Sequence, residues 1–346
     1  MKTFLHVGYP KCASSFIQDY YFVPENKFIK IVDNPENGGE WRDYLNCQLY
    51  TAQNSWFNSG HPEIPSIPNE SGWMLGLSAE GFLDTERAGG VDYDVALSRY
   101  KDIFPDSKVL IVIRNQPNLI YSYYQQHVRH GYTRKIDTFI KELTWNAQQS
   151  IWGRLCFDRI YQMTTDIFSD VLLLPFELLV VDPDEFVSRL NQFFGMGGKI
   201  HDPTVGHKHR ADVHAPSGPK RTNPSPSSTT TETMRLLNLV FRHGFGKTYH
   251  SILPDHMVGH GRFHMNRLSW NEPSGSLTWS VKKWANRIGN RLPSSSTTRE
   301  HFFIRHKELF EDNFAESNAR LDKILKLNLG KYNYVGTDLA YSNREA

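Results

Sequence analysis

Residues 1–16 constrain the fold more than any other stretch of the chain. Residues 3–7 form a short, mostly apolar run that stops at Gly8, as a buried strand does when it reaches a tight turn. Lys11 follows in a loop, and Ser14 and Ser15 are predicted to cap a helix. Backbone N–H groups at a helix start lack partners within the helix and lie at the positive end of its dipole. This strand, loop and helix therefore predict an anion-binding site.

The loop differs from the nucleoside-triphosphate pattern G-x-x-x-x-G-K-[ST]. Aligned on Gly8, that pattern requires a glycine, a lysine and a hydroxyl residue where the chain has Ala13, Ser14 and Ser15. A different lysine, Lys11, lies earlier in the turn. The sequence thus argues against an ordinary ATPase. A divergent P-loop nucleoside or sugar kinase, dependent on ATP and Mg²⁺, stays open as an alternative.

Cys12 has the position of a nucleophile in a cysteine phosphatase loop, where a helix N-terminus lowers the thiol pKa. Such a loop also needs an arginine at the position where this chain has Gln18. We therefore interpret Cys12 as a small loop residue. Neither Cys47 nor Cys156 forms a C-x-x-C pair with it, so the sequence predicts no disulfide framework and a reducing compartment.

A second phosphate-binding pattern begins about a hundred residues later. Residues 109–113 form an apolar run typical of a buried strand, and Arg114 ends it. Asn115 and Pro117 then predict a turn into a helix that carries Ser122. An arginine at the carboxyl end of a strand offers bidentate recognition of a phosphate, and a serine hydroxyl can donate one more hydrogen bond.

Both patterns resemble those of the sulfotransferases that use 3′-phosphoadenosine 5′-phosphosulfate (PAPS). The segment GYPKCASSF is similar to their 5′-phosphosulfate loop, P-K-[ST]-G-[ST]-[ST], with Cys12 and Ala13 replacing the usual small residue and glycine. Residues 114–124 are similar to their 3′-phosphate pattern, R-[DN]-P-x-[DE]-x-x-x-S-x-Y. Here the proline comes one residue late, and Asn118 replaces a common acid. The bacterial, carbohydrate-type branch is most similar, and the resemblance covers residues 1–20, 75–195 and 305–335.

The resemblance implies an α/β, P-loop-kinase-like three-layer fold with a central parallel sheet flanked by helices. Residues 1–346 would form a single sulfotransferase domain, with a variable acceptor-side and lid region at about 200–305. PAPS would be the sulfuryl donor and 3′-phosphoadenosine 5′-phosphate (PAP) the product, and no metal is implied. Lys11 would be catalytic, stabilising the bridging oxygen of the donor, and would also bind it. The other implied donor ligands are Cys12, Ala13, Ser14, Ser15, Arg114, Ser122, Arg221 and Asn223.

Glu80 is the candidate for proton transfer. Residues 73–77 predict a strand, and the segment GLSAEGF places Glu80 just after it. In an open α/β sheet, ligands bind outside the carboxyl ends of the strands. The alternative is a carboxylate that caps the next helix. The resembling enzymes place a histidine or a glutamate after the corresponding strand, so the resemblance implies Glu80 as the general base.

Later apolar patterns predict the rest of the sheet and its crossovers. Residues 171–174 predict a strand, and Glu177 is predicted to anchor a neighbouring turn or to cap a helix rather than to do chemistry. Asp182 and Pro183 are predicted to open a helix that ends near Gly195. Further helices are predicted over residues 136–149, 151–164 and from 308 onward.

The acceptor is predicted to bind within residues 230–305. Residues 207–305 carry 15 Lys and Arg against 5 Asp and Glu. Aromatic rings among cations suit a sugar or an anionic acceptor, although buried tryptophans are the commoner explanation. The tryptophans concerned are Trp270, Trp279 and Trp284.

Residues 201–228 predict a long loop or lid. Arg221, Asn223 and Ser225 in that loop resemble nucleotide contacts of bacterial relatives. A zinc site on a helix would suit the four-residue spacing of His256, His260 and His264, but intervening glycines disfavour the helix and hence the metal.

The remaining sequence features limit the possible location and binding partners of the protein. No apolar run approaches a membrane span and no signal peptide precedes the first strand, so the sequence predicts a cytoplasmic protein without a transmembrane segment. The net charge of +2 gives no reason to expect nucleic acid as a partner. A nucleotide donor and a small-molecule or glycan acceptor are expected, and the oligomeric state is left open. A non-catalytic nucleotide- or glycan-binding module is the third hypothesis.

Overall fold

A computed structural model describes residues 2–50, 54–68, 71–83, 92–129, 132–147, 150–197, 231–233, 235–236 and 296–337. These residues fall into two compact units. The first draws on residues 1–116, 148–222 and 313–346, and the second on residues 117–147 and 223–312. The predicted organisation of residues 1–346 as a single domain stays a prediction.

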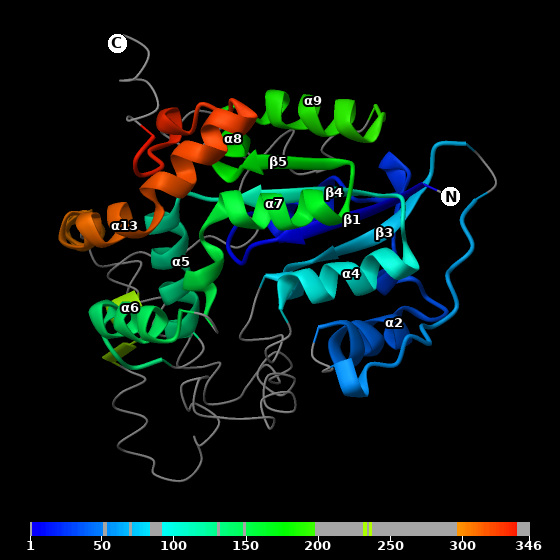
Figure 1. Cartoon of the computed structure of the whole chain (residues 1–346), viewed down its shortest axis with the longest axis horizontal. Helices are drawn as coiled ribbons and strands as arrows, with labels where there is room; N and C mark the ends of the chain where they lie inside the picture. The colour runs from blue at the N-terminus through cyan, green and yellow to red at the C-terminus, as the bar shows by residue number, and fades with distance from the viewer. Residues whose placement is uncertain are drawn as a thin grey trace. The chain divides into compact units, whose positions relative to one another are not determined.

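The first unit contains a five-stranded, all-parallel sheet with the order β2-β3-β1-β4-β5 (Figure 1). The central strand β1 pairs with β3 on one side, with Val7 opposite Ala79, and with β4 on the other, with Val7 opposite Ile111. The strands are β1 (Lys2–Gly8), β2 (Phe28–Lys30), β3 (Met74–Ala79), β4 (Ser107–Ile113) and β5 (Val171–Pro175).

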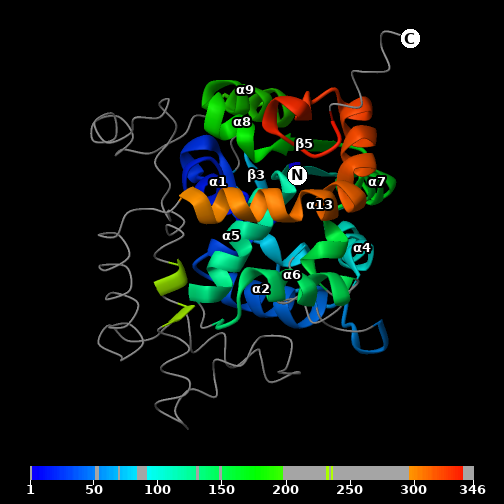
Figure 2. The same ribbon diagram turned by 90° about the vertical axis from the view of Figure 1, so that its left-hand side faces the viewer.

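Helices cover both faces of this sheet, and Figure 2 shows α1 and α9 on one side with α4 and α7 on the other. The predicted α/β fold, three layers around a central parallel sheet, is therefore confirmed. The α-helices that lie wholly within the described part of the first unit are α1 (Ser14–Tyr20), α2 (Gly38–Tyr44), α4 (Tyr93–Ile103), α7 (Phe157–Ile167), α8 (Phe176–Val181) and α9 (Pro183–Phe194). Short 3₁₀ turns span Pro24–Asn26, Ile31–Asp33, Asn54–Trp56, Glu80–Phe82, Ile151–Arg154 and Leu329–Tyr332, and a π-helical turn spans Leu45–Leu49.

Aromatic side chains fill the layer between the sheet and the α1/α9 side. Phe4 of β1 stacks on Phe22 with ring centroids 4.7 Å apart, and Phe28 meets Phe194 edge-on at 5.3 Å. His6 lies on the same face of β1 as Phe4, because side chains two apart on a strand share a face. Its ring lies 5.5 Å from that of Phe22, and its Nδ1 is 2.6 Å from Ser78 Oγ. The first strand thus buries a polar ring inside an aromatic core.

Several predicted boundaries differ from the observed ones. The helix predicted over residues 151–164 is wrong at its start: a 3₁₀ turn occupies Ile151–Arg154, and α7 begins only at Phe157. Ser150 Oγ accepts a hydrogen bond from the Trp152 N–H at 3.2 Å, which stabilises that separate turn. The helix predicted to reach residue 149 ends at Trp145, and the strand predicted over 73–77 covers Met74–Ala79.

The second unit contains most of α5 (Gln116–Arg129), all of α6 (Ile136–Trp145), and the first part of α13 (Ser296–Leu325). Tyr124 of α5 packs on Phe139 of α6 with ring centroids 5.6 Å apart. Asp137 of α6 accepts hydrogen bonds from Arg305 at 2.7 Å and from the ring of His306 at 3.0 Å. Aromatic packing and ion pairs together hold this unit.

Within the described part of the chain, no helix combines the length and the apolar character that crossing a membrane would require.

Candidate functional site

The loop after β1 has two residues in a left-handed backbone conformation. Lys11 has a φ of 68° and Ala13 a φ of 62°, and the Cys12 N–H donates to the Tyr9 carbonyl at 3.2 Å. Helix α1 begins at Ser14 with Ala13 at the N-cap position, where no side chain caps it. The prediction that Ser14 and Ser15 cap the helix is therefore wrong, because both lie inside its first turn. The predicted strand, loop and helix are confirmed.

Ala13→Gly is expected to stabilise the fold by about 0.5–1 kcal/mol. The left-handed conformation at position 13 strains any residue with a Cβ, and glycine relieves that strain although it adds entropy to the unfolded chain. Urea unfolding of both proteins measures the difference. The matched control is Ala96→Gly in the middle of α4, where the same change should destabilise by about 1 kcal/mol. A loss of stability at both positions would contradict the proposed strain.

Cys12 is fully buried at the centre of the loop. Burial raises the pKa of its thiol well above the ordinary value, although the charges of Arg114 and Lys11 oppose this. A raised pKa disfavours the thiolate that a phosphatase nucleophile must form. All three cysteines are free thiols. These observations agree with the interpretation of Cys12 as a packed loop residue.

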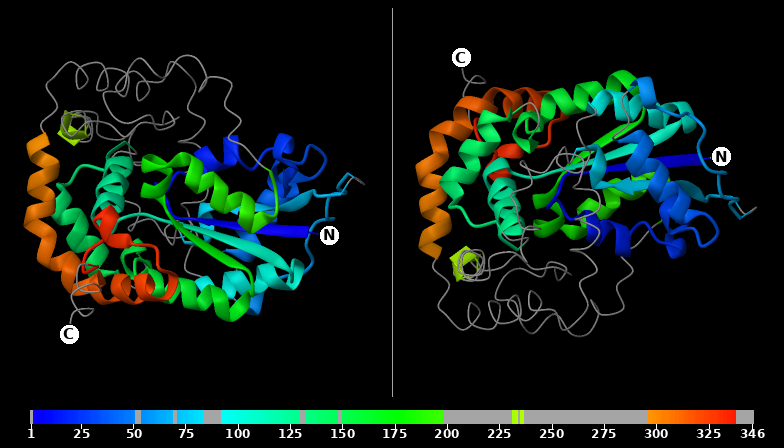
Figure 3. Two further views of the ribbon diagram at one scale, coloured as in Figure 1. Left: turned by 90° about the horizontal axis from the view of Figure 1, so that it is seen from above. Right: turned by 90° about the horizontal axis from the view of Figure 1, so that it is seen from below.

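Glu80 lies against the beginning of the loop. Pairing of Val7 with Ala79 sets Gly8 beside Glu80 at the carboxyl edge of the sheet. A Cβ added at Gly8 would lie 2.2 Å from Ser14 Oγ and 3.5 Å from Glu80 Cγ. The strands begin at the end of the sheet where Figure 3 marks the N-terminus, so this edge lies at the opposite end. A side chain at position 8 would have to displace the Ser14 hydroxyl, so glycine favours the close approach of the strand end and the helix start.

Arg114 connects the two sequence patterns. It follows β4, is buried, and donates from one terminal guanidinium nitrogen to the Lys11 carbonyl at 2.8 Å. Its guanidinium carbon lies 4.8 Å from the ring centre of Phe176. The structure therefore brings Arg114 and Lys11 together, although they are far apart in the sequence. Ser122 is buried in α5, within the second unit, and its phosphate contact stays a prediction.

Glu177 anchors the turn after β4, as predicted. Its Oε1 accepts from the Asn115 N–H at 3.0 Å, and its Oε2 accepts from the Tyr334 hydroxyl at 3.0 Å. Burial raises the pKa of its carboxyl, and the Asn115 N–H and the charge of Arg114 work against that shift. The buried Glu177 carboxylate thus accepts two hydrogen bonds and lies near the positive charge of Arg114.

Two residues near the loop were not predicted from the sequence. The fully buried Tyr9 donates from its hydroxyl to the Arg154 carbonyl at 2.6 Å. The guanidinium of Arg154 donates to the Phe82 carbonyl, also at 2.6 Å. Arg154 therefore joins the loop to the turn that carries Glu80. No sequence motif identifies Arg154. The one sequence signal for Tyr9 was its aromatic side chain between Gly8 and Lys11.

The remaining predicted contacts lie outside the described residues. They are Arg221, Asn223, Ser225, the three tryptophans of the acceptor region, and the histidines at 256, 260 and 264. Within the described ranges, no three His, Cys, Asp or Glu side chains are grouped so that they could hold a metal ion. The donor groups near the loop are N–H groups, a lysine and an arginine, a set that suits an anionic phosphate or sulfate.

A loop of this kind at the carboxyl edge of a parallel sheet, after its central strand, is typical of P-loop-kinase-like folds, in which ligands bind outside the carboxyl ends of the strands. The sulfotransferase domain model matches residues 97–251 of this chain, a region that includes Arg114, Ser122 and Glu177. The matched region is therefore similar to enzymes that transfer sulfate.

One solved structure that resembles the chain is described as a sulfotransferase from Alicyclobacillus acidocaldarius. It is 19% identical in sequence, and the match covers 58% of this chain and 84% of that one with a TM-score of 0.41. No curated protein gives a significant match.

Proposed function

We propose that the protein transfers a sulfuryl group from PAPS to a hydroxyl group of an acceptor. The observation that carries the proposal is the Arg114–Lys11 contact, because it joins a cation from the 3′-phosphate pattern to the 5′-phosphosulfate loop. PAPS carries phosphates at both ends of its ribose, so a donor site must offer anion-binding groups from two elements. The loop after β1 and the end of β4 are two such elements.

In the reaction, a bond forms between the acceptor oxygen and sulfur, and the bond from sulfur to the bridging oxygen of the 5′-phosphate breaks. Lys11 stabilises the charge that develops on this leaving oxygen, and the N–H groups at the start of α1 hold the phosphosulfate together with Ser14 and Ser15. Glu80 takes the proton that the acceptor hydroxyl loses. Transfer of this kind depends mainly on positioning and on charge stabilisation, which these residues supply without a metal.

A titration that compares PAPS with ATP, each with and without Mg²⁺, tests the donor. Binding of PAPS without Mg²⁺ and weaker binding of ATP are expected. Mg²⁺-dependent binding of ATP in preference to PAPS would contradict the proposal and favour the divergent kinase. Binding of PAP or glycans without any turnover would favour the non-catalytic module.

PAP is expected to bind more tightly than AMP by about 2 kcal/mol or more, because PAP adds a 3′-phosphate that Arg114 and Ser122 can bind. Arg114→Ala should erase most of this preference while AMP affinity changes much less. Isothermal titration of both nucleotides measures it, and Arg189→Ala, which changes a partly exposed arginine of α9, is the control. Equal affinity of the unmodified protein for PAP and AMP would remove PAPS as the donor.

We propose a carbohydrate or glycolipid acceptor, on the basis of the aromatic and basic composition of residues 230–305. Screening of sugars, lipids and phenols with labelled donor tests this choice. Transfer to simple phenols alone would refute the carbohydrate preference. The three free thiols also support the proposal of a reducing, cytoplasmic location.

A further inference from the structure

A buried polar network joins the turn after β4 to the segment after α13. The Asn115 side-chain amide donates to the carbonyls of Tyr332 and Asn333. Gln116 donates to Asn318 Oδ1 at 2.7 Å, and the Asn318 amide donates in return to Gln116 Oε1 at 3.2 Å. The consecutive residues Asn115 and Gln116 thus form hydrogen bonds with α13 and with the segment that follows it.

Glu177 completes this network from a third element. One carboxylate oxygen holds the backbone of Asn115, and the other holds the hydroxyl of Tyr334. The Asn318 amide also donates to the Val335 carbonyl at 3.0 Å. Asn115, Gln116 and Asn318 are at most 2% exposed, so a lost bond leaves a polar group away from water. The turn therefore has one strongly favoured conformation.

This turn begins at the residue that contacts the phosphate loop. Arg114 precedes Asn115 directly, donates to the Lys11 carbonyl, and lies over Phe176, the neighbour of Glu177 in α8. A shift of the Asn115 backbone would move the Arg114 guanidinium relative to the loop. The segment at residues 329–335 is consequently connected to the loop through Glu177, Asn115 and Arg114.

We propose that Glu177 and residues 329–335 are positioning elements of the donor site, which hold Arg114 against the phosphate loop before the donor binds. The role for donor affinity rests on the proposed function, whereas the role for the conformation of the loop does not. A loop that is already in its binding conformation loses less entropy when an anion arrives.

Glu177→Gln and Tyr334→Phe test the proposal with little change of shape. Glu177→Gln removes the charge and turns one acceptor into a donor. Tyr334→Phe removes one hydrogen bond and keeps the ring that packs edge-on against Phe157 at 6.3 Å. Each variant is expected to weaken PAP binding by about tenfold and to raise the KM for PAPS more than it lowers kcat.

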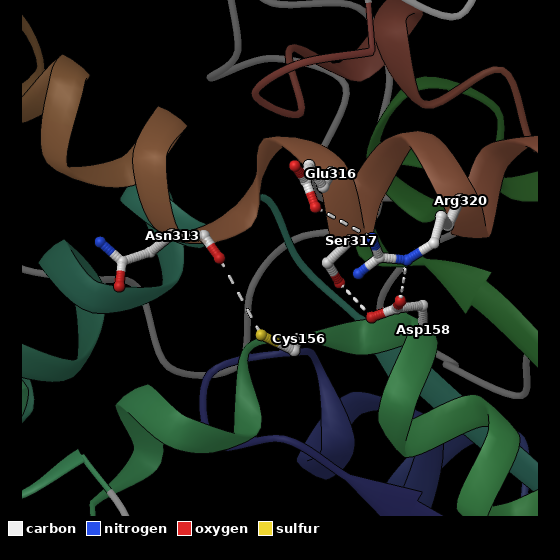
Figure 4. A network of polar contacts seen from close by, with 6 residues as sticks. All are labelled: Cys156, Asp158, Asn313, Glu316, Ser317 and Arg320. Carbon is white, nitrogen blue, oxygen red and sulfur yellow. Dashed lines mark hydrogen bonds and ion pairs between the residues drawn. The ribbon is translucent and has the colours of Figure 1, made fainter.

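The matched control is Asp158→Asn, at another polar contact between α13 and the rest of the first unit (Figure 4). Asp158 accepts from Ser317 and from Arg320 Nε at 2.7 Å, while the Cys156 thiol points to the Asn313 carbonyl. This variant also loosens α13, but both hydrogen-bond donors to Asp158, Ser317 and Arg320, belong to α13 and not to the Arg114 turn. It should lower the melting temperature by a similar amount and change PAP affinity less than twofold.

Two measurements separate positioning from general destabilisation. When Arg114 is already replaced by alanine, adding Glu177→Gln should lower PAP affinity by less than a further factor of two. Both substitutions remove the same contact of the Arg114 guanidinium with the phosphate loop. Amide hydrogen exchange at residues 9–15 should quicken in Glu177→Gln and Tyr334→Phe and stay unchanged in Asp158→Asn.

Unchanged exchange at residues 9–15 in both test variants would overturn the positioning role, whatever the protein binds. Additive effects of Glu177→Gln and Arg114→Ala would also overturn it. Equal affinity of the unmodified protein for PAP and AMP refutes the proposed donor instead, and the exchange measurement then still decides the positioning role.

Discussion

Glu80→Gln is expected to lower kcat by about 10²- to 10⁴-fold while donor affinity stays nearly unchanged. The acceptor hydroxyl must lose its proton as it attacks sulfur, and a glutamine cannot take that proton. The Glu80 side chain lies beside Gly8, at the start of the loop that is proposed to hold the transferred group. Steady-state turnover at saturating PAPS, together with PAP binding, measures both quantities.

The control for this substitution is Glu25→Gln, which changes an exposed carboxylate in the Pro24–Asn26 turn and should leave kcat unaltered. Turnover of Glu80→Gln within threefold of the unmodified enzyme would remove Glu80 from the mechanism. A histidine of the region at residues 230–305 would then be the next group to substitute. A loss of PAP binding in Glu80→Gln would instead indicate that the carboxylate shapes the loop.

The fold is expected to lose about 2 kcal/mol of stability between pH 7 and pH 5 through His6. Burial lowers the pKa of His6 from 6.5 to about 3, and its Nε2 has no hydrogen-bond partner among the described residues. The folded state thus favours the neutral ring. This contribution is fully present above pH 6.5, where the unfolded chain is also neutral, and is lost progressively as the pH falls toward about 3.

Urea unfolding at several pH values measures this loss. His6→Gln removes the titrating ring and should flatten the pH dependence, even if it lowers stability at pH 7. His61→Gln, which changes an exposed histidine, should keep the slope of the unmodified protein. An equal slope in all three proteins would show that His6 does not titrate on unfolding.

The sequence predicted four of the five described strands, because each is a short, mostly apolar run of the kind that a parallel sheet buries. It did not predict β2 or α2. Strand β2 has three residues at the edge of the sheet, and α2 has seven in a stretch rich in Asn, Gly and Trp, so neither leaves a periodic pattern. Their positions depend on tertiary contacts such as Phe28 against Phe194.

The sequence predicted where three candidate site residues lie, whereas their chemical roles stay predictions. Lys11, Glu80 and Arg114 follow strand ends, and the parallel sheet brings those ends to one edge. The left-handed backbone at Ala13 was not predictable, because alanine gives no signal for it. The partners of Glu177 and Arg154 were hidden for another reason: hydrogen bonds between distant segments leave no local pattern, and Tyr334 lies 157 residues after Glu177.

The central place of β1 in the sheet also sets the order in which the protein can assemble. Thr3 meets Ser107, 104 residues later, and His6 meets Ser78, 72 residues later. At ribosomal rates of about 5–20 residues per second, the first strand waits about 5–20 s for its β4 partner. During that time its apolar residues Phe4, Leu5 and Val7 lack the sheet that buries them. Exposure of an apolar strand to solvent during synthesis follows from that delay.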